Sequence, residues 1–126
     1  MLNNEFVIYE QALKLKELGF DKDCFGWYNG NKPQYVIIQN STNKEWEIEG
    51  SKHCAAPLKQ QAFKWFRENA KLFGVVNYYT TDQYFIEILD SNGNMACNTK
   101  GMEFVTYEEA ELKCIYKLIE LINFKS

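Results

Sequence analysis

The sequence is poor in several residues that carry chemistry or mark special environments. It has one histidine and two prolines, and its longest apolar runs are only three or four residues. A membrane-spanning helix needs about 20 apolar residues, so none is predicted. The first residues lack a basic segment followed by an apolar one, which predicts no secretory signal. We therefore expect a soluble, cytoplasmic protein without membrane contact.

The chain also lacks an excess of positive charge. It has 14 Lys and Arg and 17 Asp and Glu, which gives a formal charge of −3. Such a chain has no overall attraction for nucleic acid or for an anionic membrane. The cysteines contain no CxxC pair, which favours reduced thiols over disulfides or zinc ligands. His53 adjoins Cys54, but adjacency alone makes neither a metal site nor an activated thiolate. The four cysteines are Cys24, Cys54, Cys97 and Cys114.

Established catalytic motifs are missing as well. The sequence has no GxGxxG, GxxxxGK[ST], GxSxG or HExxH pattern. Asp82, Glu87 and Asp90 could approach one another around one strand, yet nothing predicts the burial that tunes a carboxylate for acid–base work. The sequence thus predicts no catalytic residue, cofactor or metal. A small enzyme of unknown class stays a third hypothesis.

Aromatic residues, by contrast, are abundant. Nine Phe, eight Tyr and three Trp make up 16% of the 126 residues. The length suits one globular domain over residues 1–126. Its core cannot use so many rings, so we expect some at the surface or at a partner. Tyr and Trp rings in strands could also stack on bases, although most strand aromatics fill cores.

The first half of the chain alternates a helical segment with strand segments. Helical spacing from residue 8 to 18, with Gly19 after it, predicts a helix. Residues 24–28 and 35–39 have strand character, and Asn29-Gly30 signals the turn of a hairpin. Segment 40–51 is either a long loop or a loop bearing a short edge strand.

The second half begins with a predicted helix over 57–71, with Pro57 at its first position and Gly74 as the residue that terminates it. Strands follow at 75–79 and at 83–89, the latter central because it alternates most clearly. Either 95–97 or 102–105 supplies a last strand. The pair Thr106 and Glu109 forms a capping box that starts a third helix, which extends to about residue 123.

Together these elements predict an α+β class. The order is α-β-β-α-β-β(-β)-α, with three helices and four to five mainly antiparallel strands, the helices lying on one face of the sheet.

Two helix surfaces are candidates for binding. The third helix has a core stripe and a second apolar stripe, Leu112, Tyr116 and Ile119, at i, i+4 and i+7. Either this helix is buried on two sides or it meets another chain. We therefore favour a non-enzymatic protein-interaction module, which could be a homodimer. No partner is predicted by name.

The alternative is a nucleic-acid-binding accessory factor. Gln60, Lys64, Arg67 and Lys71 follow one another at i, i+4, i+7 and i+11 of the second helix. Such a row could follow phosphates. More often, however, a row of this kind is the solvated back of an amphipathic helix.

Several segments also resemble a known group of proteins. They are 12–21 (ALKLKELGFD), 24–26 (CFG), Ala56-Pro57 leading to 60–68 (QQAFKWFRE), and 107–111 (YEEAE). The chain resembles small uncharacterised proteins encoded among phage and prophage genes of gut Bacteroides and relatives. The resemblance covers most of the length and implies a phage-associated setting. It implies no activity and no site residue.

Overall fold

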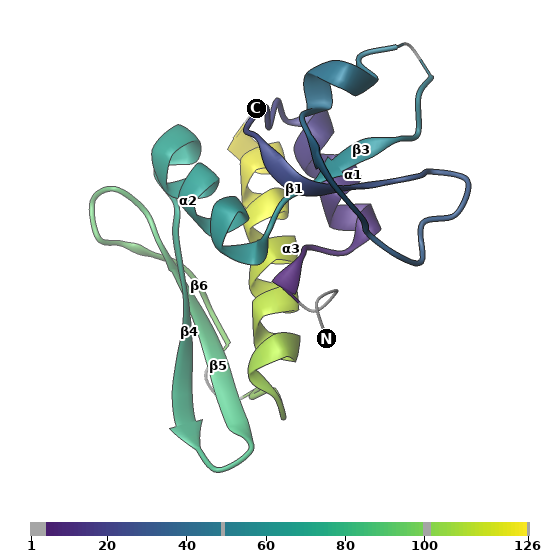
Figure 1. Cartoon of the computed structure of the whole chain (residues 1–126). Coiled ribbons are helices and arrows are strands. Elements are labelled where there is room, and N and C mark those ends of the chain that lie inside the picture. The colour runs from purple at the N-terminus through teal and green to yellow at the C-terminus, as the bar shows by residue number, and fades with distance from the viewer. Residues whose placement is uncertain (1–4, 49, 100–101, 126) are drawn as a thin grey trace. The chain divides into compact units, whose positions relative to one another are not determined.

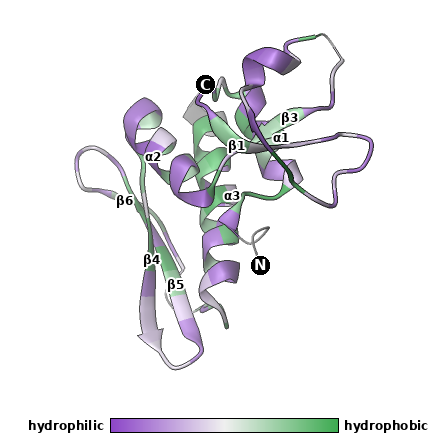
Figure 2. Cartoon of the chain, viewed as in Figure 1, coloured by the Kyte–Doolittle hydropathy of each residue, from purple (hydrophilic) through white to green (hydrophobic). Residues whose placement is uncertain are grey.

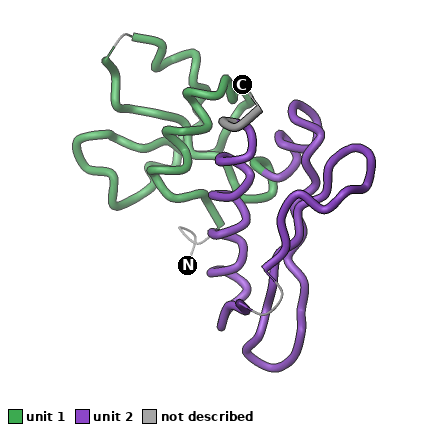
Figure 3. The backbone as a smooth tube through the Cα atoms, turned by 180° about the vertical axis from the view of Figure 1, so that it is seen from behind, with its two compact units in different colours: residues 1–62 green, residues 63–126 purple. Residues whose placement is uncertain are grey.

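A computed structural model describes residues 5–48, 50–99 and 102–125 of the chain, with side chains through Ile122 (Figure 1). The chain divides into two compact units, residues 1–62 and residues 63–126 (Figure 3). The described residues contain three α-helices and two antiparallel three-stranded sheets. The predicted α+β class is confirmed, and the strands form two sheets instead of the one expected.

Among the described residues, the first unit holds one complete α-helix, the beginning of a second, three strands and the 3₁₀ helix η2. Its sheet has the order β2-β1-β3, and both pairings are antiparallel. Gly19, with a φ of 100°, directly follows the C-cap of the helix, as predicted. The elements are α1 (Tyr9–Glu17), β1 (Cys24–Tyr28), β2 (Ile37–Ser41), η2 (Asn43–Trp46) and β3 (Cys54–Ala56).

The inner face of this sheet packs against α1. Along β1, Cys24, Gly26 and Tyr28 are buried, whereas Phe25 and Trp27 between them are not. The Tyr28 ring meets Tyr9 of α1 edge to face, with centroids 5.6 Å apart. Period-two alternation therefore gives β1 one face in the core and one outer face.

Segment 40–51 and the residues after it differ from the prediction. Part of the segment forms η2, and β3 follows it, although no strand was expected there. Buried Asn43 joins distant backbone: its Nδ2 donates to the Phe20 carbonyl and its Oδ1 accepts from the Ala55 amide, both at 2.8 Å. This long-range side-chain pairing positions β3, which local propensity does not favour.

Helix α2 spans Lys59–Ala70 and buries an aromatic face. Ala62, Phe63, Trp65 and Phe66 are all buried. Both predicted ends of 57–71 need correction. Pro57 precedes the helix and is not its first residue, and the chain leaves the helix at Lys71, whose φ is 55°. Gly74 is not the helix terminator either, because it lies inside the next strand.

The second unit pairs β4 (Phe73–Thr80), β5 (Gln83–Leu89) and β6 (Met95–Asn98) in that order. The bounds of β5 and its central position are confirmed. Of the two candidates for the last strand, 95–97 is the one that forms, while Phe104 makes an isolated bridge to Tyr84.

Helix α3 (Tyr107–Lys125) packs on β4 and β5. The Thr106 hydroxyl accepts from the Glu109 amide at 3.1 Å, which is the predicted start of this helix. Figure 2 shows the apolar residues of α3 and of the middle of β5 in green. None of the helices in the described ranges is long and apolar enough to cross a membrane.

Candidate interaction surface

The sheet of the second unit has a covered face and an open face. Ile86 and Ile88 of β5 are completely buried on the covered face. Gly74 of β4 lies on the same face, because a Cβ built there would be 2.9 Å from Cys114 Sγ and 3.1 Å from Leu118 Cδ1, both in α3. Even-numbered residues of β4 and β5 therefore point toward α3, and odd-numbered residues point away from it.

The open face is built from rows of residues that pair directly across the strands. One row joins Phe73, Leu89 and Met95, the next joins Val75, Glu87 and Asn98, and the third joins Asn77 and Phe85. Directly paired residues project from the same side of a sheet. We call these residues together with Tyr79 the sheet-face patch.

Large apolar side chains of the sheet-face patch remain accessible to water. Phe73 is 37% exposed, Val75 41%, Met95 47% and Tyr79 50%. The Tyr79 and Phe85 rings meet edge to face with centroids 6.3 Å apart. A contiguous set of apolar side chains on one sheet face is what a bound protein surface can cover.

A polar pair lies in the middle of the sheet-face patch. Asn77 Nδ2 donates a hydrogen bond to Glu87 Oε1, and both residues are half-buried. An ionised carboxylate accepts several hydrogen bonds, so Glu87 can also receive a donor from a partner. The arrangement is an apolar surface with one polar anchor.

The outer face of the first unit is arranged differently. Trp27 of β1 stacks on Trp46 of η2, with ring centroids 4.7 Å apart. His53 meets both indoles edge to face, at 5.8 Å and 5.4 Å. The Gly30 amide donates to His53 Nδ1 at 2.9 Å. Nδ1 therefore acts as an acceptor, and the only histidine serves a structural contact.

Three of the four cysteines are buried. Burial raises the pKa of Cys24, Cys54 and Cys114 to about 12, which keeps these thiols protonated. Cys97 is half-buried. Among the described residues, no three His, Cys, Asp or Glu side chains gather as metal ligands do.

The three carboxylates that could have met around the central strand are separated. Asp82 lies in the turn before β5, and Asp90 follows its other end. Asp90 Oδ1 accepts from the amides of Asn92 and Asn94, both at 2.9 Å, and so holds a turn. Glu87 accepts from Asn77. A strand of seven residues therefore separates the two aspartates.

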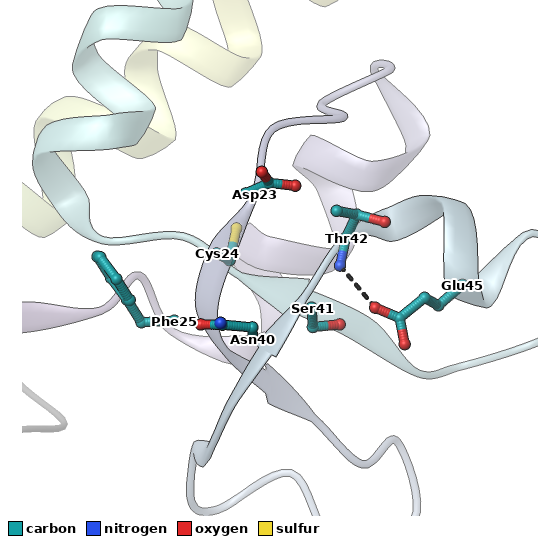
Figure 4. Close-up of a pocket in the computed structure, with 7 residues that line it drawn as sticks. All are labelled: Asp23, Cys24, Phe25, Asn40, Ser41, Thr42 and Glu45. Carbon is teal, nitrogen blue, oxygen red and sulfur yellow. Dashed lines mark hydrogen bonds between the residues drawn. The ribbon is translucent and has the colours of Figure 1, made fainter.

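A pocket of about 420 Å³ lies in the first unit beside β1, β2 and η2 (Figure 4). Its polar groups serve the local fold: the Thr42 amide donates to Glu45 Oε1 at 3.0 Å, and Ser41 Oγ accepts from Trp46 Nε1 at 3.0 Å. The Phe25 ring points away from Glu45. The lining residues are Asp23, Cys24, Phe25, Asn40, Ser41, Thr42 and Glu45.

The second apolar stripe of the third helix is largely withdrawn from water. Ile119 is only 5% exposed, and Leu112 and Tyr116 are half-buried. Ile115, beside this stripe, is completely buried. Of the two interpretations of this stripe, these exposures favour a helix that is buried on two sides over one that meets another chain.

The four candidate nucleic-acid contacts are all exposed, but only three of them lie on the helix. Gln60, Lys64 and Arg67 lie exposed on α2. Lys71 is exposed too, but it lies beyond the helix in the left-handed conformation, so the i+11 spacing does not apply to it. Exposure suits a phosphate contact and a solvated helix face equally.

The sheet-face patch was not located from the sequence. The surplus of aromatic residues predicted only that some rings would lie at the surface. Surface rings were expected, and Phe25, Tyr35, Tyr78 and Tyr79 are indeed at least half exposed. The signal that could have located the patch is that β5 carries apolar residues on both of its alternating faces, with Phe85 and Leu89 on either side of Glu87. Comparison with protein-family models, with curated proteins and with solved structures found no match for the chain.

Proposed function

We propose that this chain is a non-enzymatic protein-interaction module that binds its partner on the sheet-face patch. The observation that carries the proposal is the open apolar face of the β4-β5-β6 sheet, with Val75 41% and Tyr79 50% exposed. Covering an apolar side chain is worth roughly 25 cal/mol for each Å² removed from water. A partner that covers this face gains that free energy over several neighbouring side chains.

The composition of the sheet-face patch also supports a protein ligand. Protein interfaces are enriched in aromatic residues and methionine at their centres, and the patch holds Phe73, Tyr79, Phe85 and Met95. The Asn77–Glu87 pair supplies a polar anchor within it. Buried thiols and a histidine engaged with Gly30 agree with a non-enzymatic role.

The test compares a variant of the patch with a matched variant elsewhere. Val75→Asp places a charge on the open face, while Ile48→Asp changes an apolar residue that is 73% exposed in the first unit. Proteins of the source organism retained by the immobilised wild-type chain are purified, and the affinity of each variant for them is measured directly. We expect Val75→Asp to weaken binding at least about tenfold, with little effect from Ile48→Asp.

Hydrogen exchange of the complex locates the interface independently. Protection should increase in residues 73–79 and 83–89 on binding. Equal affinity of Val75→Asp and wild type, or protection confined to the first unit, would overturn the proposal.

A further inference from the structure

The outer edge of β4 is a second surface that this sheet leaves available. In the order β4-β5-β6, β4 is an edge strand, and the described residues place no other strand against it. Its sequence, FGVVNYYT, contains neither a charged residue nor proline. Edge strands of monomers usually carry lysine, proline or a charge that prevents pairing with another chain. β4 lacks these protections, and its bulge lies only near its end, between Tyr78 and Thr80.

Hydrogen bonds of β5 show which backbone groups of β4 face outward. The Thr99 amide donates to the Ile86 carbonyl, and Tyr84 exchanges both backbone bonds with Phe104. Even-numbered residues of β5 therefore direct their N–H and C=O toward the β6 side, and odd-numbered ones direct theirs toward β4. Because Phe85 pairs with Asn77 and Glu87 with Val75, the odd-numbered residues of β4 bond to β5.

The N–H and C=O groups of Gly74, Val76 and Tyr78 consequently point to the free edge. No backbone hydrogen bond from another described segment reaches them. A strand that pairs with this edge must match its own outward-facing residues to these positions. When β4 pairs with β4 of a second copy, even-numbered residues must therefore lie opposite even-numbered residues.

We propose that two copies of this chain pair through β4, antiparallel about a two-fold axis at Asn77. In this register Val76 lies opposite Tyr78 of the second copy, and Val75 lies opposite its Tyr79. Tyrosine opposite a β-branched residue is a favourable cross-strand pair. The absence of charge from β4 means that no like charges meet.

Because even-numbered residues of β4 lie opposite even-numbered residues of the second copy, the relative orientation of the two sheets is fixed as well. Residues opposite one another project from the same side, so both open faces lie on one side of the joined sheet. The two sheet-face patches then form one continuous surface. The inference goes beyond the proposed function, because it concerns the edge of the sheet and holds whether or not the face binds another protein.

Disulfide trapping tests the register with two neighbouring positions. Both variants are made in the full chain with Cys97→Ser, because Cys97 is the half-buried native cysteine and the other three are buried. Asn77→Cys places identical thiols across the axis, where a non-hydrogen-bonded pair suits a disulfide. Val75→Cys is the matched control, since it lies on the same strand and face but opposite Tyr79. We expect linked dimer to form roughly tenfold faster with Asn77→Cys than with Val75→Cys.

Light scattering of the wild-type chain over a range of concentrations should show a dimer. A monomer throughout, or a dimer in which Asn77→Cys links no faster than Val75→Cys, overturns the inference. If β4 amides gain protection only when another protein is bound, the edge receives a strand of that protein and the inference is also wrong. If the dimer is not found but Val75→Asp still weakens binding of the partner, the proposed function stands. If Asn77→Cys forms the linked dimer but Val75→Asp does not weaken binding, only the proposed function is overturned.

Discussion

In the first unit, η2 carries Trp46 onto Trp27 and so covers part of the outer sheet face, whereas in the second unit Val75 and Tyr79 stay 41% and 50% exposed. The difference lies in the connections between strands. The segment between β2 and β3 is long enough to fold back over the sheet. The connection between β5 and β6 is a tight turn held by Asp90 and cannot do so. An outer face is covered by its own chain only where a connection is long enough to reach it.

The largest expected effect separates the two faces of the second sheet. Ile88→Ala removes a completely buried side chain and should lower the free energy of unfolding by about 2 to 5 kcal/mol. Val75→Ala, on the open face, should lower it by less than about 1 kcal/mol. Urea unfolding measures both. Equal losses would mean that the sheet-face patch is as well packed as the covered face.

The second prediction compares a buried polar contact in each unit. Asn43→Ala leaves the Phe20 carbonyl and the Ala55 amide without their partner, and should cost about 2 to 4 kcal/mol. In the second unit, Thr99 Oγ1 accepts from the Ile86 amide at 2.9 Å. Thr99→Val removes that one acceptor and should cost about 1 to 3 kcal/mol. The comparison is wrong if Thr99→Val proves the more damaging change in urea unfolding.

The third prediction concerns alkaline pH. The pKa of each buried thiol rises from 9.0 to about 12 on folding, because burial disfavours the thiolate. The stability due to a protonated thiol is therefore complete below pH 9 and is lost as pH rises toward 12. At a pH of about 10.5 the loss is roughly 2 kcal/mol for each thiol.

This loss should differ between the units. The first unit holds Cys24 and Cys54, together with Tyr28, whose pKa is also raised to about 12 by burial. The second unit holds only Cys114 among the thiols with a raised pKa. Hydrogen exchange at increasing pH should show the amides of residues 24–28 losing protection before those of β5, after correction for the intrinsic exchange rate. Simultaneous loss in both units would contradict the assignment.

The smallest expected effect comes from removing the cover of the first sheet. Trp46→Ala leaves the Trp27 ring without its stacked neighbour and should cost roughly 1 kcal/mol. It should also expose an aromatic face like that of the second unit, and so increase binding of a hydrophobic dye. Ile48→Ala, at a residue that is already 73% exposed, is the control and should change neither quantity. Unchanged dye binding by Trp46→Ala would show that η2 is not the cover.

Much of the secondary structure was predictable because its signals are local. The bounds of β1 and β5 follow from strand-type residues between turn residues, and Thr106 starts α3 through its hydroxyl. One local signal was overlooked: Thr42 and Glu45 have the spacing of a capping box and begin η2. In contrast, β3 contains Ala55 and Ala56, which have low strand propensity, and it forms through pairing with β1 and contact with Asn43.

The candidate site was predictable only as a class. The surplus of rings predicted surface aromatics, but the surface that the sequence favoured was the stripe of Leu112, Tyr116 and Ile119, in which Ile119 is only 5% exposed and the other two residues are half-buried. A helical stripe shows that a surface is apolar without showing whether other segments of the same chain cover it.

The sequence by itself determined the α+β class, the helix limits near Gly19 and Thr106, and the central position of β5. Those features depend on caps, turns and alternation within a few residues. Only the tertiary structure decided which face of β5 is covered. Ile86 and Ile88 on one face and Phe85 and Leu89 on the other are all apolar, and Glu87 is the charged residue that disfavours burial of the second face. Alternation within the strand does not show which segment covers either face. Helix α3, which is distant from β5 in sequence, packs on one face of the sheet and leaves the sheet-face patch on the other.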